Sequence, residues 1–255
     1  MTELIETSIE DGIAEIRFNR SAALNTINAS MAEAFAAAVG RVTADRGTRV
    51  IVFSGNGRSF MAGGDLRAFY ETPVADRPEL SQRIISPMNQ ALKELASTDI
   101  LSVSSLHGAV AGAGMSIALM SDFAVASDDA TFNFAYTRVA ASPDCGGSYA
   151  LTRLVGHRRA LEIALLSDPV SAQQGLAWGL VNQIVPVAQL RSASIELARR
   201  LAQGSRTALG ATKRLLRDSL SATLEAQLDA ECKSFAQLSG EADFARALDG
   251  FFQRK

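Results

Sequence analysis

The sequence predicts an α/β fold with a mostly parallel sheet, followed by a helical C-terminal region. Two observations predict it: apolar strand patterns alternate with helical periodicity up to Pro186, and only helical periodicity follows. Strands separated by helices are joined by crossovers and run parallel. The 255 residues can bury a large core. We expect a core domain over residues 1–190 and a helical region over residues 191–255.

The first elements are a hairpin, a helix and a buried strand. Residues 4–9 and 13–18 alternate apolar and polar side chains around Asp11-Gly12, whose glycine permits a tight turn. From Asn28 onward, apolar residues recur at helical spacing, and this helix should end before Gly47. Residues 49–54 follow as an apolar run, which indicates a buried strand.

The alternation continues with a helix at 87–96, a strand at 100–105, a short helix at 112–120 and a strand at 123–126. Residues 67–78 are expected to be a mobile surface segment that could cover a pocket. Four helices are expected near the C-terminus, at 190–202, 207–220, 224–238 and 242–252. They are too apolar for one small core, so their surplus surface predicts a subunit interface.

Composition excludes several classes of protein. The net charge is −2, the isoelectric point is about 5.8 and basic residues are scattered, which argues against nucleic acid as the partner. Two cysteines without a CxxC motif indicate neither a disulfide framework nor a zinc site. The acidic N-terminus and the lack of long apolar runs predict a cytoplasmic protein without a signal peptide or membrane span.

Two glycine-rich turns, at 61–66 and 108–114, and a carboxylate within 142–147 carry the chemistry. Small residues let backbone N–H groups approach a ligand, so two such turns can direct two donors at one carbonyl oxygen. Taken alone, the turns could equally be tight turns without a ligand. Asp144 is the candidate acid/base, and its structural alternative is the N-cap of a helix beginning near Gly146. Neither turn matches a nucleotide-phosphate motif.

Five blocks resemble the crotonase (enoyl-CoA hydratase/isomerase) superfamily, over nearly the whole chain. They are Phe18-Asn19-Arg20 with Leu24-Asn25, residues 54–66, residues 108–114 with Asp122, residues 143–147 and residues 177–181. Within it, the chain most resembles the 1,2-epoxyphenylacetyl-CoA isomerase branch. The resemblance implies a spiral of ββα units, assembly as a homotrimer or hexamer, and an acyl-CoA thioester substrate. Coenzyme A is then part of the substrate, and neither a separate cofactor nor a metal is implied.

The same resemblance assigns the site residues. It places the oxyanion-hole N–H groups at Gly64 and Ala113 and makes Asp144 the acid/base. The expected substrate- and CoA-binding positions are Ala22, Leu24, Ala62, Asp65, Leu66, Gly112, Tyr136, Phe251 and Arg254. The last two would contact CoA from a neighbouring subunit, with Arg254 replacing the usual lysine. Ser21 stands where relatives carry a proline, so the course of this loop is open.

The type of reaction depends on the residues that replace the hydratase glutamates. Hydratases of this superfamily present two glutamates, and the matching positions here hold Ser116 and Tyr136, which we expect to line the acyl pocket. A 1,3-proton shift needs only one base, so isomerisation with Asp144 is the prediction. The alternatives are a hydratase using Asp144 alone, and a weak CoA- or RNA-binding protein. His107 and Cys145 are expected to be structural, and dehalogenation lacks its aromatic pocket and histidine base.

Overall fold

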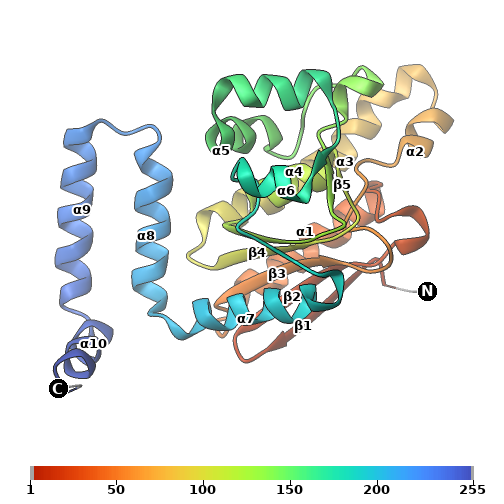
Figure 1. Ribbon diagram of the computed structural model, residues 1–255. Helices are drawn as coiled ribbons and strands as arrows, with labels where there is room; N and C mark the ends of the chain where they lie inside the picture. The colour runs from red at the N-terminus through yellow and green to blue at the C-terminus, as the bar shows by residue number, and fades with distance from the viewer. Residues whose placement is uncertain (1–2, 254–255) are drawn as a thin grey trace.

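The computed structural model describes residues 3–253, and its centre is a six-stranded sheet of order β1-β2-β3-β4-β6-β9 (Figure 1). The β1/β2 hairpin is antiparallel and every later pair in this sheet is parallel, which confirms the expected α/β class. The strands are β1 (Ile5–Glu10), β2 (Ile13–Phe18), β3 (Val50–Gly55), β4 (Leu101–Leu106), β6 (Phe123–Ser127) and β9 (Gln183–Val185).

Both faces of this sheet are apolar, as is usual for parallel strands covered by helices. Successive residues of β3 point to opposite faces. Ile51 and Phe53 join the core under α1 (Ala29–Ala44) and α3 (Arg77–Ser97), whereas Val50 and Val52 join the core under α7 (Leu190–Gln203). In Figure 1, α7 accordingly lies on the opposite side of the sheet from the other core helices.

A capping side chain and a proline mark the first residues of α1 and α3. Asn28 is the N-cap of α1, because its side-chain oxygen accepts from the N–H of Met31 at 2.9 Å. The helix expected at 87–96 is longer than predicted, starting at Arg77. Pro78 lies in its first turn, where no backbone donor is needed. The segment expected to be a mobile surface segment contains α2 (Leu66–Glu71) and a 3-10 turn (Val74–Asp76).

Short elements above the sheet in Figure 1 were not predicted, except α4 and the start of α5. A second sheet pairs β5 with β7 in parallel and β7 with β8 antiparallel. Strands of two or three residues show no readable periodicity. The elements are β5 (Ala109–Ala111), α4 (Ala113–Met120), β7 (Thr131–Asn133), α5 (Gly147–Leu161), β8 (Val170–Ser171) and α6 (Ala172–Ala177), with 3-10 turns at Ser21–Ala23, Tyr136–Val139 and Val187–Gln189 and a π-turn at Glu162–Leu166.

The last three helices lie at the left of Figure 1, where α8 contacts the body of the molecule and α9 and α10 stand apart from it. They are α8 (Arg206–Ser219), α9 (Leu224–Ser239) and α10 (Ala242–Phe252), so the predicted run of C-terminal helices is confirmed. Lys213 of α8 binds Asp122 and the carbonyl of Ile100, each at 2.8 Å. No residue of α9 or α10 is buried. Across the described chain, no helix has the length and apolarity needed to cross a membrane.

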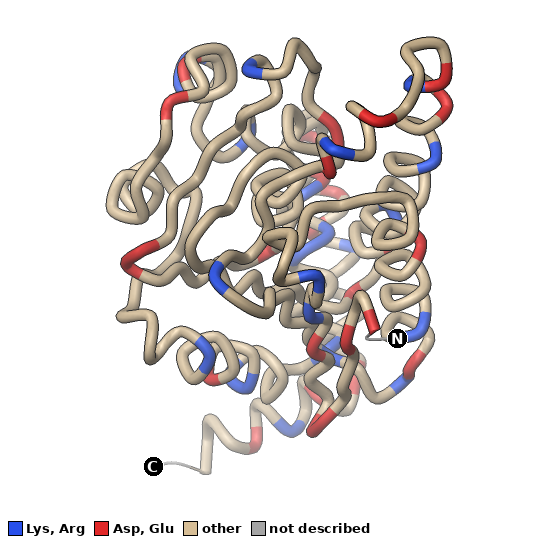
Figure 2. Tube along the Cα trace, turned by 90° about the vertical axis from the view of Figure 1, so that its right-hand side faces the viewer, with Lys and Arg blue, Asp and Glu red and all other residues tan. Residues whose placement is uncertain are grey.

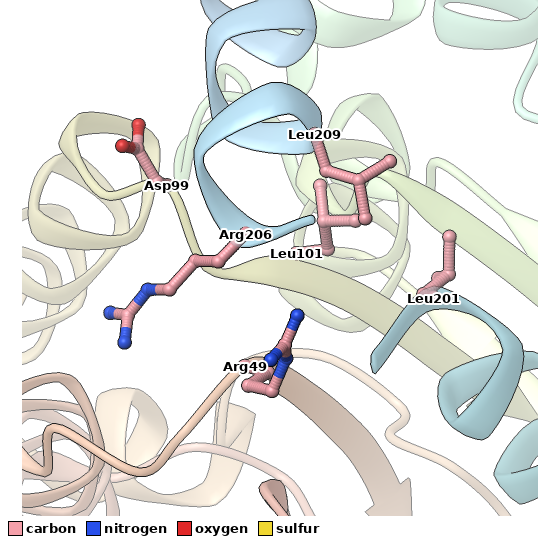
Figure 3. Close-up of a pocket in the computed structure, with 6 residues that line it drawn as sticks. All are labelled: Arg49, Asp99, Leu101, Leu201, Arg206 and Leu209. Atoms are coloured by element: carbon pink, nitrogen blue, oxygen red, sulfur yellow. The ribbon is translucent and has the colours of Figure 1, made fainter. Parts of the chain in front are cut away.

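A small cavity of about 10 Å³ marks the junction of α7, α8 and the sheet (Figure 3). Leucines line one side, and Arg49, Asp99 and Arg206 line the other. Arg49 donates to the carbonyl of Gly204, and Arg206 donates to the carbonyl of Arg46 at 2.9 Å. Ligand pockets usually enclose about 300–1,000 Å³. This space holds about one water molecule. It is a packing gap between elements and is too small to be a ligand pocket.

Charged residues are mixed over the surface. In the view of Figure 2, basic and acidic positions lie interspersed along the trace. Several pair directly, as Arg17 does with Glu15 at 2.6 Å and Lys213 with Asp122 at 2.8 Å. Proteins that track nucleic-acid phosphates carry a clustered basic stripe, and this view shows none over the described residues.

Candidate active site

The two glycine-rich turns lie against each other at the carboxyl ends of β3 and β4. Met61 joins them, because its N–H donates to the carbonyl of Ala109 at 3.1 Å and its carbonyl accepts from the N–H of Ala111 at 2.9 Å. Gly63 and Gly112 have φ angles of +104° and +51°, which disfavour any side chain. A Cβ on Gly112 would lie 3.3 Å from the Cα of Gly63. Only glycine permits this backbone contact.

This contact places the N–H groups of Gly64 and Ala113 at neighbouring turns. Ala113 is the first residue of α4, where a helical N–H has no acceptor in its own helix. Within residues 3–253, neither N–H donates to a protein acceptor. The start of α4 also carries the positive end of the helix dipole. Two such donors beside each other are suited to binding a carbonyl oxygen as it becomes negatively charged.

Asp144 is not the cap of the following helix. The N-cap of α5 is Gly146, and no side chain accepts a hydrogen bond there, so the structural alternative considered for Asp144 is wrong. Cys145 and Gly146 both have positive φ angles, of 50° and 75°, which turn the chain sharply before α5. The half-buried Asp144 carboxylate instead accepts a hydrogen bond from the hydroxyl of Tyr136 at 2.5 Å.

Tyr136 belongs to a chain of three hydrogen-bonded side chains. Its hydroxyl lies 2.9 Å from the Oγ of Ser116, and both residues are buried. Burial and the adjacent Asp144 charge raise the pKa of Tyr136 above its ordinary range, so it remains a neutral donor. The Tyr136 proton points to Asp144, and Ser116 therefore donates to Tyr136. Ser116 lies one helical turn after Ala113 in α4, so hydrogen bonds connect Asp144 with the start of this helix.

The hydrogen bonds from Ser116 through Tyr136 to Asp144 were not predicted from the sequence, which assigned Ser116 and Tyr136 to the lining of the acyl pocket. No local pattern could reveal them, because the partners come from α4, a 3-10 turn and the loop before α5. Ser116 brings the start of α4, with Gly112 and Ala113, close to Tyr136.

Cys145 and His107 have the structural roles that were expected. Cys145 is 2% exposed, and burial together with the Asp144 charge raises the pKa of its thiol. A thiol with a raised pKa is a poor nucleophile at neutral pH. The Nε2 atom of His107 lies 3.0 Å from the carbonyl oxygen of Gly57, which indicates a hydrogen bond that fixes the neighbouring loop.

The positions expected to bind CoA lie along the first turn. The carbonyl of Leu24 accepts from the N–H of Ala62 at 3.0 Å, so the loop containing Ala22 lies beside this turn. Leu66, at the start of α2, is 55% exposed. The Asp65 carboxylate pairs with Arg20 at 2.7 Å and caps α2 through the N–H of Arg67 at 3.1 Å. Asp65 therefore fixes the turn through its side chain, and its N–H also donates to the carbonyl of Ile27 at 2.9 Å.

The two C-terminal positions are not joined to this site within one chain. Phe251 is 74% exposed on α10, which stands apart from the body of the molecule in Figure 1. Arg254 lies outside the described residues. Among residues 3–253, no cluster of three or more His, Cys, Asp or Glu side chains is arranged to hold a metal ion.

Fold and site together define an α/β protein with two backbone N–H donors in neighbouring turns, both free among the described residues, and a carboxylate in the same region. The enoyl-CoA hydratase/isomerase family model matches residues 8–255. This chain belongs to the enoyl-CoA hydratase/isomerase family.

Relatives in this family carry out different reactions. The chain is 32% identical to the 1,2-epoxyphenylacetyl-CoA isomerase of Escherichia coli, over 100% of this chain and 97% of that protein. It is 30% identical to 4-chlorobenzoyl coenzyme A dehalogenase-2 of an Arthrobacter species, over 94% and 87%. An enoyl-CoA hydratase structure from Polaromonas superposes with a TM-score of 0.91 at 27% identity, over 98% and 97%. The family is therefore established, and the site must indicate the reaction.

Proposed function

We propose that the protein isomerises an enoyl-CoA or a ring-derived acyl-CoA thioester, with Asp144 as the single acid/base. The observation that carries this proposal is the surroundings of Asp144. Its hydrogen-bond partner is the neutral phenol of Tyr136, which is itself bonded to the Ser116 hydroxyl. A second carboxylate to activate water is therefore missing from this chain of contacts.

The proposed reaction is a proton shift that consumes no co-reactant. The thioester carbonyl oxygen accepts hydrogen bonds from the N–H groups of Gly64 and Ala113. Asp144 removes a proton from C2 of a 3-enoyl thioester, and the electrons of that C–H bond form a dienolate whose charge rests on the carbonyl oxygen. Asp144 then returns the proton to C4, and the double bond moves from C3=C4 to C2=C3.

The remaining residues are proposed to bind the CoA portion of the substrate. Ala22, Leu24, Ala62 and Leu66 lie along the first glycine turn, and the exposure of Ala22 and Leu66 supports this part of the proposal. Phe251 and Arg254 are proposed to act from a neighbouring subunit of a homotrimer or hexamer. The exposure of Phe251 in the single chain supports this part of the proposal.

A substrate panel provides the first test. The purified protein is assayed with 3-enoyl-CoA, 2-enoyl-CoA, ring-epoxide and 4-chlorobenzoyl-CoA thioesters. We expect turnover of the 3-enoyl or ring-epoxide compounds and near-background hydration of the 2-enoyl compound. Fast water addition would instead identify a hydratase, and chloride release would identify a dehalogenase.

Isotope transfer tests the single-base mechanism. With a 3-enoyl-CoA deuterated at C2, part of the label should reappear at C4 of the product, because the same carboxylate carries it. Incorporation of heavy oxygen from the solvent in stoichiometric amount would overturn the isomerase assignment. Full loss of the label without oxygen incorporation would keep isomerisation and show that Asp144 exchanges its proton with water during each turnover.

A further inference from the structure

The surroundings of Asp144 distinguish its two carboxylate oxygens. Oδ1 accepts the hydroxyl of Tyr136 at 2.5 Å, whereas Oδ2 has no hydroxyl donor among residues 3–253. The Tyr136 hydroxyl cannot rotate away without cost, because it also accepts from Ser116 at 2.9 Å in a buried environment. One oxygen of the carboxylate is therefore held by a hydroxyl of the protein. The buried thiol of Cys145 also borders this carboxylate, and Oδ2 is the oxygen to which no hydroxyl of the described residues donates.

The packing around this hydrogen-bonded chain fixes its geometry. The Phe134 ring lies edge-on to the Tyr136 ring at a centroid distance of 5.1 Å. Gly147 leaves room for the Ser116 hydroxyl, because a Cβ there would come 2.9 Å from Cζ of Phe134 and still closer to Oγ of Ser116. The N–H of Ala141 closes the loop by donating to the carbonyl of Tyr136 at 3.0 Å. Buried rings and hydroxyls in fixed positions hold a partner more precisely than a mobile surface group does.

The hydrogen-bonded side chains Ser116 and Tyr136 also offer the Asp144 proton no path to solvent. Ser116 is 0% exposed and Tyr136 is 8% exposed. Both hydroxyl protons point toward the carboxylate, so neither group can accept a proton from it while this arrangement lasts. A proton gained at Oδ2 can therefore leave only on the open side of the carboxylate, where the substrate would lie.

We propose that Tyr136, supported by Ser116, is a positioning residue that fixes the Asp144 carboxylate so that Oδ2 alone takes and returns the proton. This inference rests on the proposed isomerase function and adds the residue that makes the transfer internal. A carboxylate able to rotate would exchange its proton with water more often and would meet the two carbon positions less reliably.

A spectroscopic experiment tests the hydrogen bond without using activity. The chain has only three tyrosines, Tyr70, Tyr136 and Tyr149, so protein labelled with ¹³C at tyrosine Cζ should give three signals. Tyr136→Phe removes one signal and thereby assigns it. Asp144→Asn should move this signal and leave the other two in place. The signal should also stay in the phenol form up to about pH 11, above the ordinary tyrosine pKa of about 10.

A kinetic experiment tests the positioning role. Tyr136→Phe keeps the ring packed against Phe134 and removes only the hydroxyl. We expect kcat to fall about 10- to 100-fold, KM to change by no more than about twofold, and deuterium retention to fall by about half or more. Ser116→Ala should change kcat and retention in the same direction by a smaller factor. Tyr149→Phe is the matched control, because Tyr149 is 49% exposed and its ring lies under Arg153.

The outcomes separate this inference from the proposed function. Wild-type kcat and label retention in Tyr136→Phe, or a Tyr136 signal that Asp144→Asn does not move, would overturn the positioning role. Wild-type protein that isomerises no thioester in the panel would overturn the proposed function. In that case the Asp144→Asn spectrum alone supports or overturns the pairing of Tyr136 with Asp144.

Discussion

Asp144 illustrates how a single residue type can serve two purposes that only its contacts distinguish. An aspartate shortly before a helix is often a cap, yet here the cap of α5 is Gly146 and the carboxylate is bonded to Tyr136. A cap contributes about 1 kcal/mol to stability, whereas a general acid/base contributes a rate factor of about 10²–10⁴. Substitution therefore tells the two roles apart.

Asp144→Asn should remove activity and keep the fold. The amide oxygen can still accept from Tyr136, but the amide cannot take up and return a proton near neutral pH. We expect kcat to fall by a factor of about 10²–10⁴, with thermal stability and CoA affinity close to those of the wild type. Asp128→Asn, at an exposed position, is the control. Normal turnover of Asp144→Asn would show that another group is the base.

Gly147→Ala should destabilise the protein and damage the site at once. The added methyl group would overlap the Ser116 hydroxyl and lie 2.9 Å from Phe134. Overpacking of this kind costs about 1–3 kcal/mol, measurable by urea unfolding. Gly40→Ala is a matched control in α1, because a Cβ there meets no atom within 4 Å and should be neutral or stabilise the helix by up to about 1 kcal/mol. Equal stability of the two variants would contradict the packing argument.

At the scale of elements, Glu15 links three parts of the core. It lies in β2, pairs with Arg17 of the same strand at 2.6 Å and with Arg191 of α7 at 3.0 Å, and accepts from Ser54 of β3 at 3.2 Å. Burial alone would raise the pKa of Glu15. The hydrogen bonds and charges of Arg17 and Arg191 outweigh burial, so the pKa lies below its usual value of 4.5.

Glu15→Gln should therefore change stability in a pH-dependent way. A lowered pKa in the folded state stabilises the protein above the unfolded-state value of 4.5, and this contribution is lost as the pH falls below it. We expect the variant to lose about 1 kcal/mol at pH 7 and to show a smaller further loss on acidification. Urea unfolding at neutral and acidic pH measures both effects, with Glu10→Gln on the exposed end of β1 as the control. A constant difference at every pH would refute the ionic contribution.

At the scale of the whole molecule, the C-terminal helices expose more apolar surface than a single chain can bury. Polar contacts of α8 hold this region to the body, including the 2.5 Å hydrogen bond from Arg217 to the carbonyl of Ala96. Large exposed apolar patches mark binding surfaces in soluble proteins. The large apolar side chains exposed in this region are Leu216, Leu220, Leu224, Leu228, Phe235, Leu248, Phe251 and Phe252.

Removal of residues 242–255 should weaken both assembly and CoA binding. The deletion takes away Phe251 and Phe252, which are 74% and 64% exposed, together with Arg254. Sedimentation velocity and CoA titration measure the two effects on the same samples. An assembly of unchanged size with unchanged CoA affinity would show that α10 lies at neither an interface nor a CoA site.

The sequence by itself determined the repetitive elements and the positions of the turns. The hairpin, α1, the parallel strands β3, β4 and β6 and the four C-terminal helices follow from apolar spacing, which is a local property. The glycine turns and Asp144 could also be read directly, because their residue types limit the backbone or supply a charge. The sequence did not predict β5, β7, β8 or β9, since strands of two or three residues have no measurable period.

Only the tertiary structure decided what Asp144 contacts. Its carboxylate bonds to Tyr136 and does not cap α5, and the positive φ angles of Cys145 and Gly146 turn the backbone sharply between Asp144 and this helix. The chain from Ser116 through Tyr136 to Asp144 likewise joins residues separated by 20 and 8 positions. Such contacts arise when α4, the 3-10 turn and α5 pack on the sheet, and no pattern within one segment encodes that arrangement.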